Sequence, residues 1–166
     1  DNKNELKNKL NISIDLCDML YILKAYEKSW GNDFGTFQLQ RKVKGVEISV
    51  SAFFNGSEFI YPLNITFEHK KLFPKELGVS TGEMGSSMFW VKHSPIFDAT
   101  LKKFESTLAK KNFRGHIDLN CIVNGNGIYP LEFTSRFGFP QIFIQRAGVH
   151  EPFGNMLYKI ANGENF

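Results

Sequence analysis

The feature that most constrains the fold is a stretch in which apolar and polar residues alternate up to a glycine-rich turn. Within residues 117–123 every second residue is apolar, residues 124–127 read Asn-Gly-Asn-Gly, and residues 128–133 are again largely apolar. Successive side chains of a strand point to opposite faces, so a period of two indicates a half-buried β-strand. Asn-Gly pairs favour tight reversals of the chain. The stretch therefore predicts an antiparallel hairpin.

Further strands are predicted upstream of this hairpin. Residues 37–54 alternate in the same way with an interruption at Gly45, which predicts either two strands or one bent strand. The Asn-Gly pair at 55–56 predicts a turn into a strand at 59–61, and another strand is expected near 65–67.

Apolar residues recur at helical spacing in three stretches, residues 14–28, 97–108 and 153–160. The pair Ser94-Pro95 is a plausible start for the second helix, because proline is well accepted in a first helical turn. Helices that lie between antiparallel hairpins are typical of the α+β class. We expect a mostly antiparallel sheet with helices packed on one face.

The chain of 166 residues is long enough for one ordinary domain. Residues 1–13 are rich in Lys and Asn, so we expect a flexible N-terminal segment followed by a single subdomain over residues 14–166. Cys17 and Cys121 lie far apart and outside any metal-binding spacing, which favours two buried, reduced cysteines over a zinc site or a disulfide.

Charge and hydropathy indicate which kinds of binding partner to expect. A net charge of +3 fits a protein that handles anionic metabolites, but it does not indicate nucleic-acid binding. No stretch approaches the roughly 18 apolar residues of a membrane span, and the polar N-terminus does not resemble a secretory signal. We expect a cytoplasmic protein with neither nucleic acid nor a membrane among its partners.

Two carboxylates flank the Asn-Gly-Asn-Gly turn. Asp118 and Glu132 are nearly equally distant from its centre, which predicts that they lie close to opposite one another on one face of the sheet. Facing carboxylates repel unless a cation lies between them, and Mg²⁺ suits such oxygen ligands. In the alternative interpretation both acids are solvated. Arg136 would then pair with either, whereas in a functional site it would clamp a phosphate.

Residues 69–95 read as a long irregular region, and such regions are often functional. The glycine-rich part at 78–85 could cradle an anion with help from the lysines of the preceding His-Lys-Lys motif, or its glycines could serve turn geometry alone. His69 is expected to be a hydrogen-bonded structural residue. Glu47, within a strongly β-forming run, could face solvent or belong to a site.

Three motifs together resemble a known family. KGVEISVSAFFNG resembles the G-x-E-x-S strand pair of ATP-grasp ligases. EHKK followed by TGEMGSS resembles the HKR…TGGMGA signature of phosphoribosylamine–glycine ligases, and PLEFTSRFGFPQ resembles their EFNxRFGDPE. The motifs occur in the order of that family, over roughly residues 36–145, so the chain resembles the C-terminal part of its ATP-grasp domain.

This resemblance implies ATP and Mg²⁺ as cofactors, with Mn²⁺ as an alternative metal. Glu47 matches the glutamate near the nucleotide ribose, and the hinge over adenine would be Leu39, Gln40 and Arg41. The implied metal ligands are Glu132, Asp118 and Thr134. Arg136 matches an arginine near the phosphates and the substrate, which makes it the candidate catalytic residue.

The resemblance also implies small-molecule amine and carboxylate substrates, joined through an acyl phosphate as in purine biosynthesis. The loop associated with phosphoribosylamine would be formed by Lys70, Thr81, Gly82, Met84 and Gly85. We find no segment that matches the upstream half of the ATP-grasp domain. We therefore expect that half to be supplied by the same or another chain.

Several residues depart from the family pattern. Thr134 replaces a metal-binding asparagine, Phe139 and Gln141 replace an Asp and a Glu, and Glu83 replaces a glycine. These changes keep a second hypothesis open, namely a non-catalytic nucleotide- or metabolite-binding module. A third hypothesis, a nucleic-acid or partner-binding domain, is supported only by the mild basicity.

Overall fold

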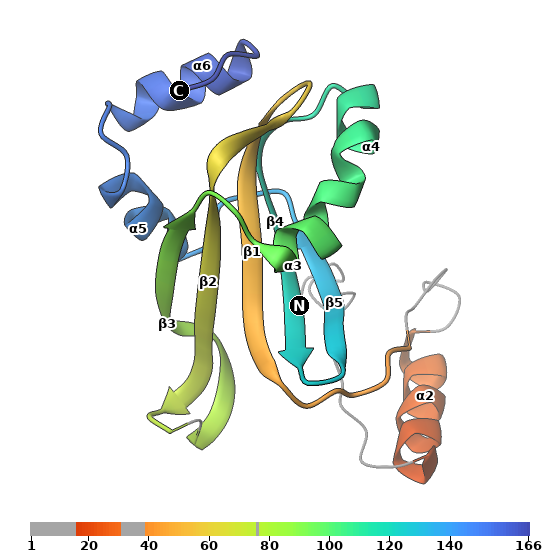
Figure 1. The fold of residues 1–166 in the computed structure, drawn as a ribbon. Coiled ribbons are helices and arrows are strands. Elements are labelled where there is room, and N and C mark those ends of the chain that lie inside the picture. The colour runs from red at the N-terminus through yellow and green to blue at the C-terminus, as the bar shows by residue number, and fades with distance from the viewer. Residues whose placement is uncertain (1–15, 31–38, 76) are drawn as a thin grey trace. The chain divides into compact units, whose positions relative to one another are not determined.

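The computed structural model describes residues 16–30, 39–75 and 77–166, and the chain divides into two compact units, residues 1–43 and 44–166. The first unit contains helix α2 (Leu16–Trp30), which confirms the first predicted helix (Figure 1). Asp18 in its first turn and Lys28 in its last have the signs that the helix dipole favours. The segment 1–13, expected to be flexible, lies outside the described residues.

The second unit is built on a five-stranded sheet in the order β3-β2-β1-β4-β5, and every neighbouring pair is antiparallel. Its strands are β1 (Val46–Asn55), β2 (Phe59–Phe73), β3 (Leu77–Val91), β4 (Arg114–Asn124) and β5 (Gly127–Thr134). The α+β class, the mostly antiparallel sheet and both predicted hairpins are confirmed. Residues 39–45 contain no strand, so the described part of 37–54 holds one strand rather than two.

The prediction of an irregular region over 69–95 is wrong. Strand β2 runs through the expected strand at 65–67 to Phe73, and β3 returns beside it, so that the two form one long hairpin. Strand β1 pairs with β2 only as far as Phe67. Beyond that point no other described strand pairs with the β2–β3 hairpin, and the hairpin has no well-buried face. A strand without a buried face does not show apolar alternation.

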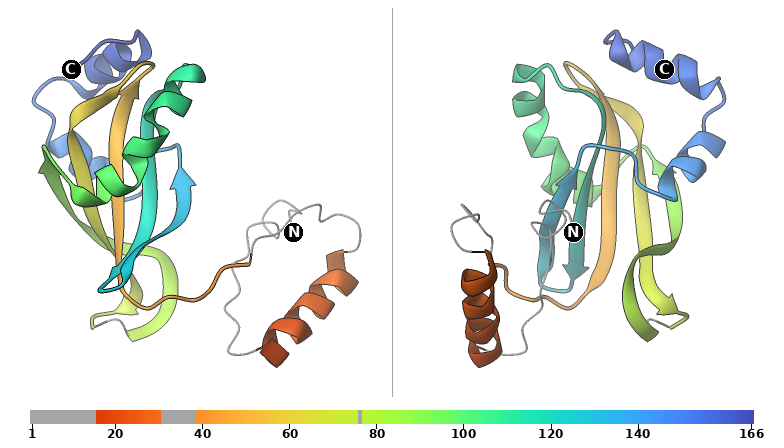
Figure 2. Two further views of the ribbon diagram at one scale, coloured as in Figure 1. Left: turned by 45° about the vertical axis from the view of Figure 1, so that its right-hand side comes forward. Right: turned by 180° about the vertical axis from the view of Figure 1, so that it is seen from behind.

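Helices cover both faces of the sheet, not one (Figure 2). On one face the core includes Val50, Phe54 and Leu119, with Phe97 from helix α3 (Pro95–Ala99) and Leu101 from the 3-10 turn η2 (Leu101–Phe104). On the other, Phe53 and Ile60 pack against Met156 and Ile160 of helix α6 (Phe153–Ala161). The neighbours Phe53 and Phe54 thus belong to different cores, because adjacent strand residues point to opposite faces.

The second predicted helix begins as expected. The Ser94 side chain accepts a hydrogen bond from Phe97 N at 3.3 Å, and Pro95 is the first helical residue. The helix is interrupted at Thr100 and resumes as α4 (Glu105–Lys110). Helix α6 confirms the third prediction. In the described part of the chain, none of the helices has the length and apolar character needed to cross a bilayer.

Helix α5 (Gln141–Ala147) was not predicted from the sequence. Its two buried residues are Gln141 and Gln145, one helical turn apart on the same face. Because this inward face is polar, the helix has no apolar stripe by which it could be recognised.

Candidate functional site

The sheet face beneath α5 carries two rows of polar side chains, each crossing strands β2, β1, β4 and β5. The first row is Thr66, Ser49, Asn120 and Glu132, and the second is Asn64, Ser51, Asp118 and Thr134. In each row the residues from β2, β1 and β4 are buried. Buried polar groups are costly unless they are paired, so such a surface is far more typical of a binding site than of a core.

The predicted pairing of Asp118 with Glu132 is wrong in register. Asp118 lies opposite Thr134, and Glu132 lies opposite Asn120. Leu131 has no partner on β4, which makes it the extra residue of a β-bulge. With an unbroken register Glu132 would face Leu119 on the opposite side of the sheet. The bulge therefore turns Glu132 onto the face that carries Asp118.

The sequence carries one signal for this bulge. Pro130 directly precedes Leu131, and proline within a sheet is largely confined to edge strands and bulges. Strand β5 is an edge strand. The proline indicates an irregular register, but it does not identify the extra residue.

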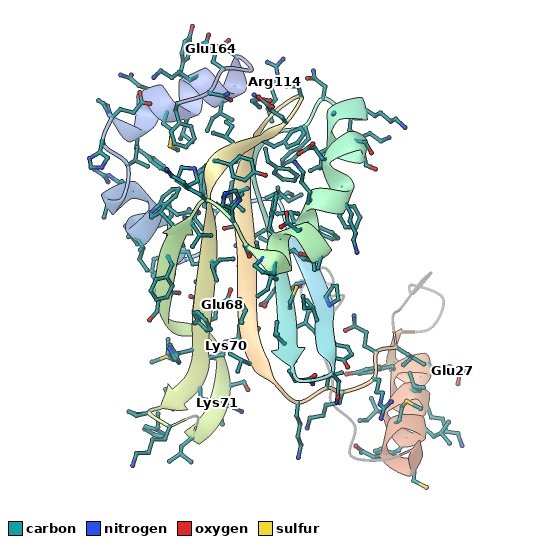
Figure 3. All side chains as sticks on the ribbon, in the orientation of Figure 1. Glu27, Glu68, Lys70, Lys71, Arg114 and Glu164 are labelled. Atoms are coloured by element: carbon teal, nitrogen blue, oxygen red, sulfur yellow. The ribbon has the colours of Figure 1, made fainter. Side chains whose placement is uncertain are left out.

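A linked set of charged and amide groups borders the first polar row, on the side away from the second row. Lys70 Nζ lies 2.5 Å from Glu47 Oε1 and 3.2 Å from Glu68 Oε2. Asn120 Nδ2 donates to the same Glu47 oxygen at 2.7 Å and lies 3.4 Å from Glu68 Oε2. Gln141 Nε2 donates to Glu68 Oε1 at 2.9 Å. Figure 3 labels Glu68 and Lys70 close together on β2.

Glu68, Asn120 and Gln141 were not among the predicted site residues. Glu68 directly precedes the His-Lys-Lys motif, and Asn120 follows Asp118 at the next position on the same face, so both lie within two residues of a predicted site residue. Gln141 departs from the family pattern. Its contact with Glu68 depends on a helix that the sequence did not predict.

The electrostatics of the face are dominated by acids. Burial raises the pKa of Asp118 to about 7, although a hydrogen bond from Ser49 opposes the shift. Burial, with the charge of Glu68, raises the pKa of Glu83 to about 7 as well. Burial would lower the pKa of Lys70, but its contacts with Glu47 and Glu68 outweigh that effect, and the net shift is upward. A face of this kind favours a cationic ligand.

The predicted metal ligands meet only part of what a metal site needs. Asp118 is buried, Glu132 is exposed and Thr134 lies between these extremes. Among the residues described, no group of three or more Asp, Glu, His or Cys side chains could hold a metal ion. Asn120 Oδ1, opposite Glu132, is buried without a hydrogen-bond partner. These oxygen donors are of the kind that a hard cation prefers.

The predicted substrate loop is part of strand β3. Thr81 Oγ1 donates to the Lys70 carbonyl at 2.7 Å, which ties the TGEMG segment to β2. Gly82 and Gly85 have open space where a side chain would begin, and Met84 is exposed.

The predicted hinge residues Leu39, Gln40 and Arg41 are exposed and belong to the first unit, whereas Glu47 belongs to the second. Arg136 is exposed just beyond β5, and its guanidinium donates to the Phe137 carbonyl at 3.1 Å. No ion pair within the described residues joins Arg136 to Asp118 or to Glu132, so the pairing considered as an alternative is absent.

His116 supports the segment that carries Arg136. Its Nδ1 lies 3.2 Å from the Arg136 carbonyl, and its Nε2 lies 2.9 Å from Gln145 Nε2. The Arg136 carbonyl can only accept, so the imidazole Nδ1 carries the proton of that hydrogen bond. Burial lowers the pKa of His116 to about 4, in keeping with a neutral ring.

Comparison with known proteins identifies the family to which this chain is similar. Residues 19–142 match the family described as phosphoribosylglycinamide synthetase, ATP-grasp (A) domain. A phosphoribosylamine–glycine ligase from Listeria monocytogenes is 25% identical over 164 residues, which cover 93% of this chain and 39% of that protein. The ligase of the same name from Fusobacterium nucleatum is 33% identical over 115 residues, 64% of this chain and 26% of that protein.

Among solved structures, phosphoribosylamine–glycine ligase from Thermotoga maritima matches with a TM-score of 0.61 at 23% identity. The match covers 89% of this chain and 40% of that structure, and at this identity it supports the fold alone. The chain thus spans well under half the length of the proteins it resembles.

Proposed function

The chain belongs to the phosphoribosylglycinamide synthetase ATP-grasp (A) domain family, and from this premise we propose that it forms the Mg-ATP-binding part of a carboxylate–amine ligase. The ligase would activate a carboxylate as an acyl phosphate for attack by an amine, most like phosphoribosylamine–glycine ligase of cytoplasmic purine biosynthesis. The remainder of such an enzyme, including the upstream half of the ATP-grasp domain, would complete the site.

One observation carries this proposal. Carboxylates from three strands, Glu47 on β1, Asp118 on β4 and Glu132 on β5, share one polar face of the sheet, and a β-bulge turns the last of them onto it. On this face Lys70 pairs with Glu47 and with the further acid Glu68. An acidic surface above buried polar rows would suit a nucleotide only with a divalent cation between the acids and the phosphates.

Glu132 and Asp118 would hold Mg²⁺ or Mn²⁺, with Thr134 beside them. When bound, the metal would neutralise charge on the phosphate oxygens. Because burial already raises the pKa of Asp118, a cation close to that carboxyl would stabilise its ionised form. Thr134 has a shorter side chain than asparagine, so we assign it a weaker share in metal binding.

Other residues would bind and orient the reactants. Glu47 would accept hydrogen bonds from the ribose hydroxyls, and Leu39, Gln40 and Arg41 would form the hinge over adenine. Arg136 is exposed and free of carboxylate partners among the described residues, so its planar guanidinium is available to clamp phosphate oxygens. The segment that would bind the amine consists of Lys70, Thr81, Gly82, Met84 and Gly85.

A non-catalytic nucleotide- or metabolite-binding module is the alternative. Phe139 replaces an acidic residue of the family pattern and is 73% exposed beside Phe143, so it adds no polar group to the site. Such a module would bind the nucleotide without turnover, even when the upstream half is supplied.

The proposal is tested by calorimetric titration of the chain with ADP or a non-hydrolysable ATP analogue, with and without Mg²⁺. We expect Mg²⁺-dependent binding that Glu132→Ala abolishes. The matched control is Glu164→Ala, which removes an exposed carboxylate far from Glu68 along the sheet (Figure 3). Binding that ignores Mg²⁺, or that Glu132→Ala leaves unchanged, would contradict the proposal.

A further inference from the structure

The Lys70 ammonium connects the segment assigned to the amine substrate with Glu47, which is assigned to the nucleotide. The family resemblance associates Lys70 with the amine substrate and Glu47 with the nucleotide. In the structure Lys70 Nζ lies 2.5 Å from Glu47 Oε1, with both side chains less than one-third exposed. A charge-assisted hydrogen bond is stronger than a neutral one and restrains both partners.

These contacts occupy only one of the two carboxylate oxygens of Glu47. Its Oε1 accepts from Lys70 and from Asn120, the latter at 2.7 Å. No hydrogen bond to Glu47 Oε2 is found among the described residues, so this oxygen can accept from a ligand. Lys70 and Asn120 hold the carboxylate from two strands, β2 and β4, that flank Glu47 on β1. An acceptor held in this way requires little ordering when a hydroxyl group binds.

Lys70 is itself held in place. Its ammonium also lies 3.2 Å from Glu68 Oε2, and Glu68 is held in turn by Gln141. Its backbone carbonyl accepts a hydrogen bond from Thr81 at 2.7 Å. A continuous set of contacts therefore runs from the TGEMG segment on β3, through Lys70, to Glu47 on β1.

We propose that Lys70 is a positioning residue of the nucleotide site, which orients the Glu47 carboxylate for the ribose hydroxyls. The inference rests on the proposed nucleotide-binding function and adds to it a role that the family pattern does not give Lys70. Lys70 acts through Glu47 and does not touch the nucleotide. Its contribution to affinity is therefore confined to ligands that carry the 2′ and 3′ hydroxyls.

The neighbouring Lys71 provides a matched control. Its ammonium donates to Ser80 Oγ at 2.9 Å, and it makes no ion pair with Glu47 or Glu68 within the described residues. Figure 3 labels it farther along the ribbon, beyond Glu68 and Lys70. Lys71→Met removes the same charge as Lys70→Met without disturbing Glu47.

The experiment compares Mg-ADP with Mg-2′,3′-dideoxy-ADP by calorimetry for the wild type, Lys70→Met, Lys70→Arg and Lys71→Met. We expect Lys70→Met to weaken ADP binding about tenfold, in line with the loss of one hydrogen bond to a charged group. The dideoxy nucleotide should lose at most about twofold, Lys70→Arg should retain most of the ADP affinity, and Lys71→Met should resemble the wild type. Thermal unfolding of each variant identifies any that fails to fold, and Lys70→Arg keeps the test valid if Lys70→Met does not.

Two results overturn the inference alone. Equal losses for ADP and the dideoxy nucleotide would mean that Lys70 acts on the phosphates or on the fold. Equal effects of Lys70→Met and Lys71→Met would mean that only net charge matters. If the folded wild type binds neither nucleotide, the proposed function fails, and the inference that rests on it fails as well.

Discussion

Asn120 lies between two carboxylates that come from different strands: its backbone is paired with Glu132 on β5, and its side-chain amide donates to Glu47 on β1 at 2.7 Å. The acid assigned to the metal and the acid assigned to the nucleotide are thus separated by one buried amide. This arrangement depends on the register of β5, and the register depends on a single residue.

Inserting an alanine between Leu131 and Glu132 should abolish Mg²⁺-dependent nucleotide binding. With the bulge at Leu131 kept, the inserted residue would pair with Asn120 and Glu132 would move opposite Leu119, on the side of the sheet covered by α3. Deleting Leu131 removes only the extra residue and leaves Glu132 opposite Asn120, so that variant should retain the metal dependence. Calorimetry with and without Mg²⁺ distinguishes the two variants. Retained metal dependence in the insertion variant would mean that the register of β5 does not set the position of Glu132.

Asn120→Asp should destabilise the protein by about 3 kcal/mol at neutral pH, because it replaces an amide donor with a carboxylate beside Glu47 and Glu68. The loss should be smaller at pH 4.5, where a protonated carboxyl can donate. Denaturant unfolding at both pH values measures it. Asn126→Asp, in the exposed turn of the same hairpin, is the control. A similar small loss for both variants would show that Asn120 does not hold the carboxylates.

Gly45→Ala should cost about 1–3 kcal/mol of unfolding free energy, because an added Cβ would lie 2.4 Å from the backbone carbonyl oxygen of Val123. The neighbouring backbone cannot move away without breaking the β1–β4 pairing. Gly125→Ala, where an added Cβ meets nothing within 4 Å, should be nearly neutral. Thermal or denaturant unfolding of both variants checks the difference, and equal stabilities would contradict the close approach at Gly45.

Glu83→Gln should stabilise the protein at pH 8 but not at pH 4.5. Burial raises the pKa of Glu83 from 4.5 to about 7, so ionising this carboxyl costs more in the folded than in the unfolded chain. Its effect on stability is therefore absent below pH 4.5, becomes increasingly unfavourable as pH rises from 4.5 to about 7, and is constant above that. Unfolding midpoints of wild type and variant over this range should diverge with increasing pH. Parallel curves, or divergence toward acid pH, would contradict the shift.

Much of the scaffold could be predicted because it is encoded locally. The period of two over 117–123, the turns at 55–56 and 124–127, and the Ser94-Pro95 helix start all depend on neighbours within a few residues. The long hairpin of β2 and β3 was missed because its outer part has no buried face to impose alternation. Helix α5 was missed because its buried face consists of Gln141 and Gln145.

The same distinction between local sequence and tertiary packing applies to the candidate site. The sequence by itself determined the α+β class, the family motifs and the identity of Glu47, Asp118 and Glu132 as candidate acids. Only the tertiary structure decided that Glu132 is paired with Asn120 and that Lys70 contacts Glu47. Periodicity and turns are set over a few bonds, whereas a bulge and a cross-strand ion pair are chosen by the packing of strands far apart in sequence. A shift of one residue exchanges the faces of a strand, so the position of the site depended on that packing.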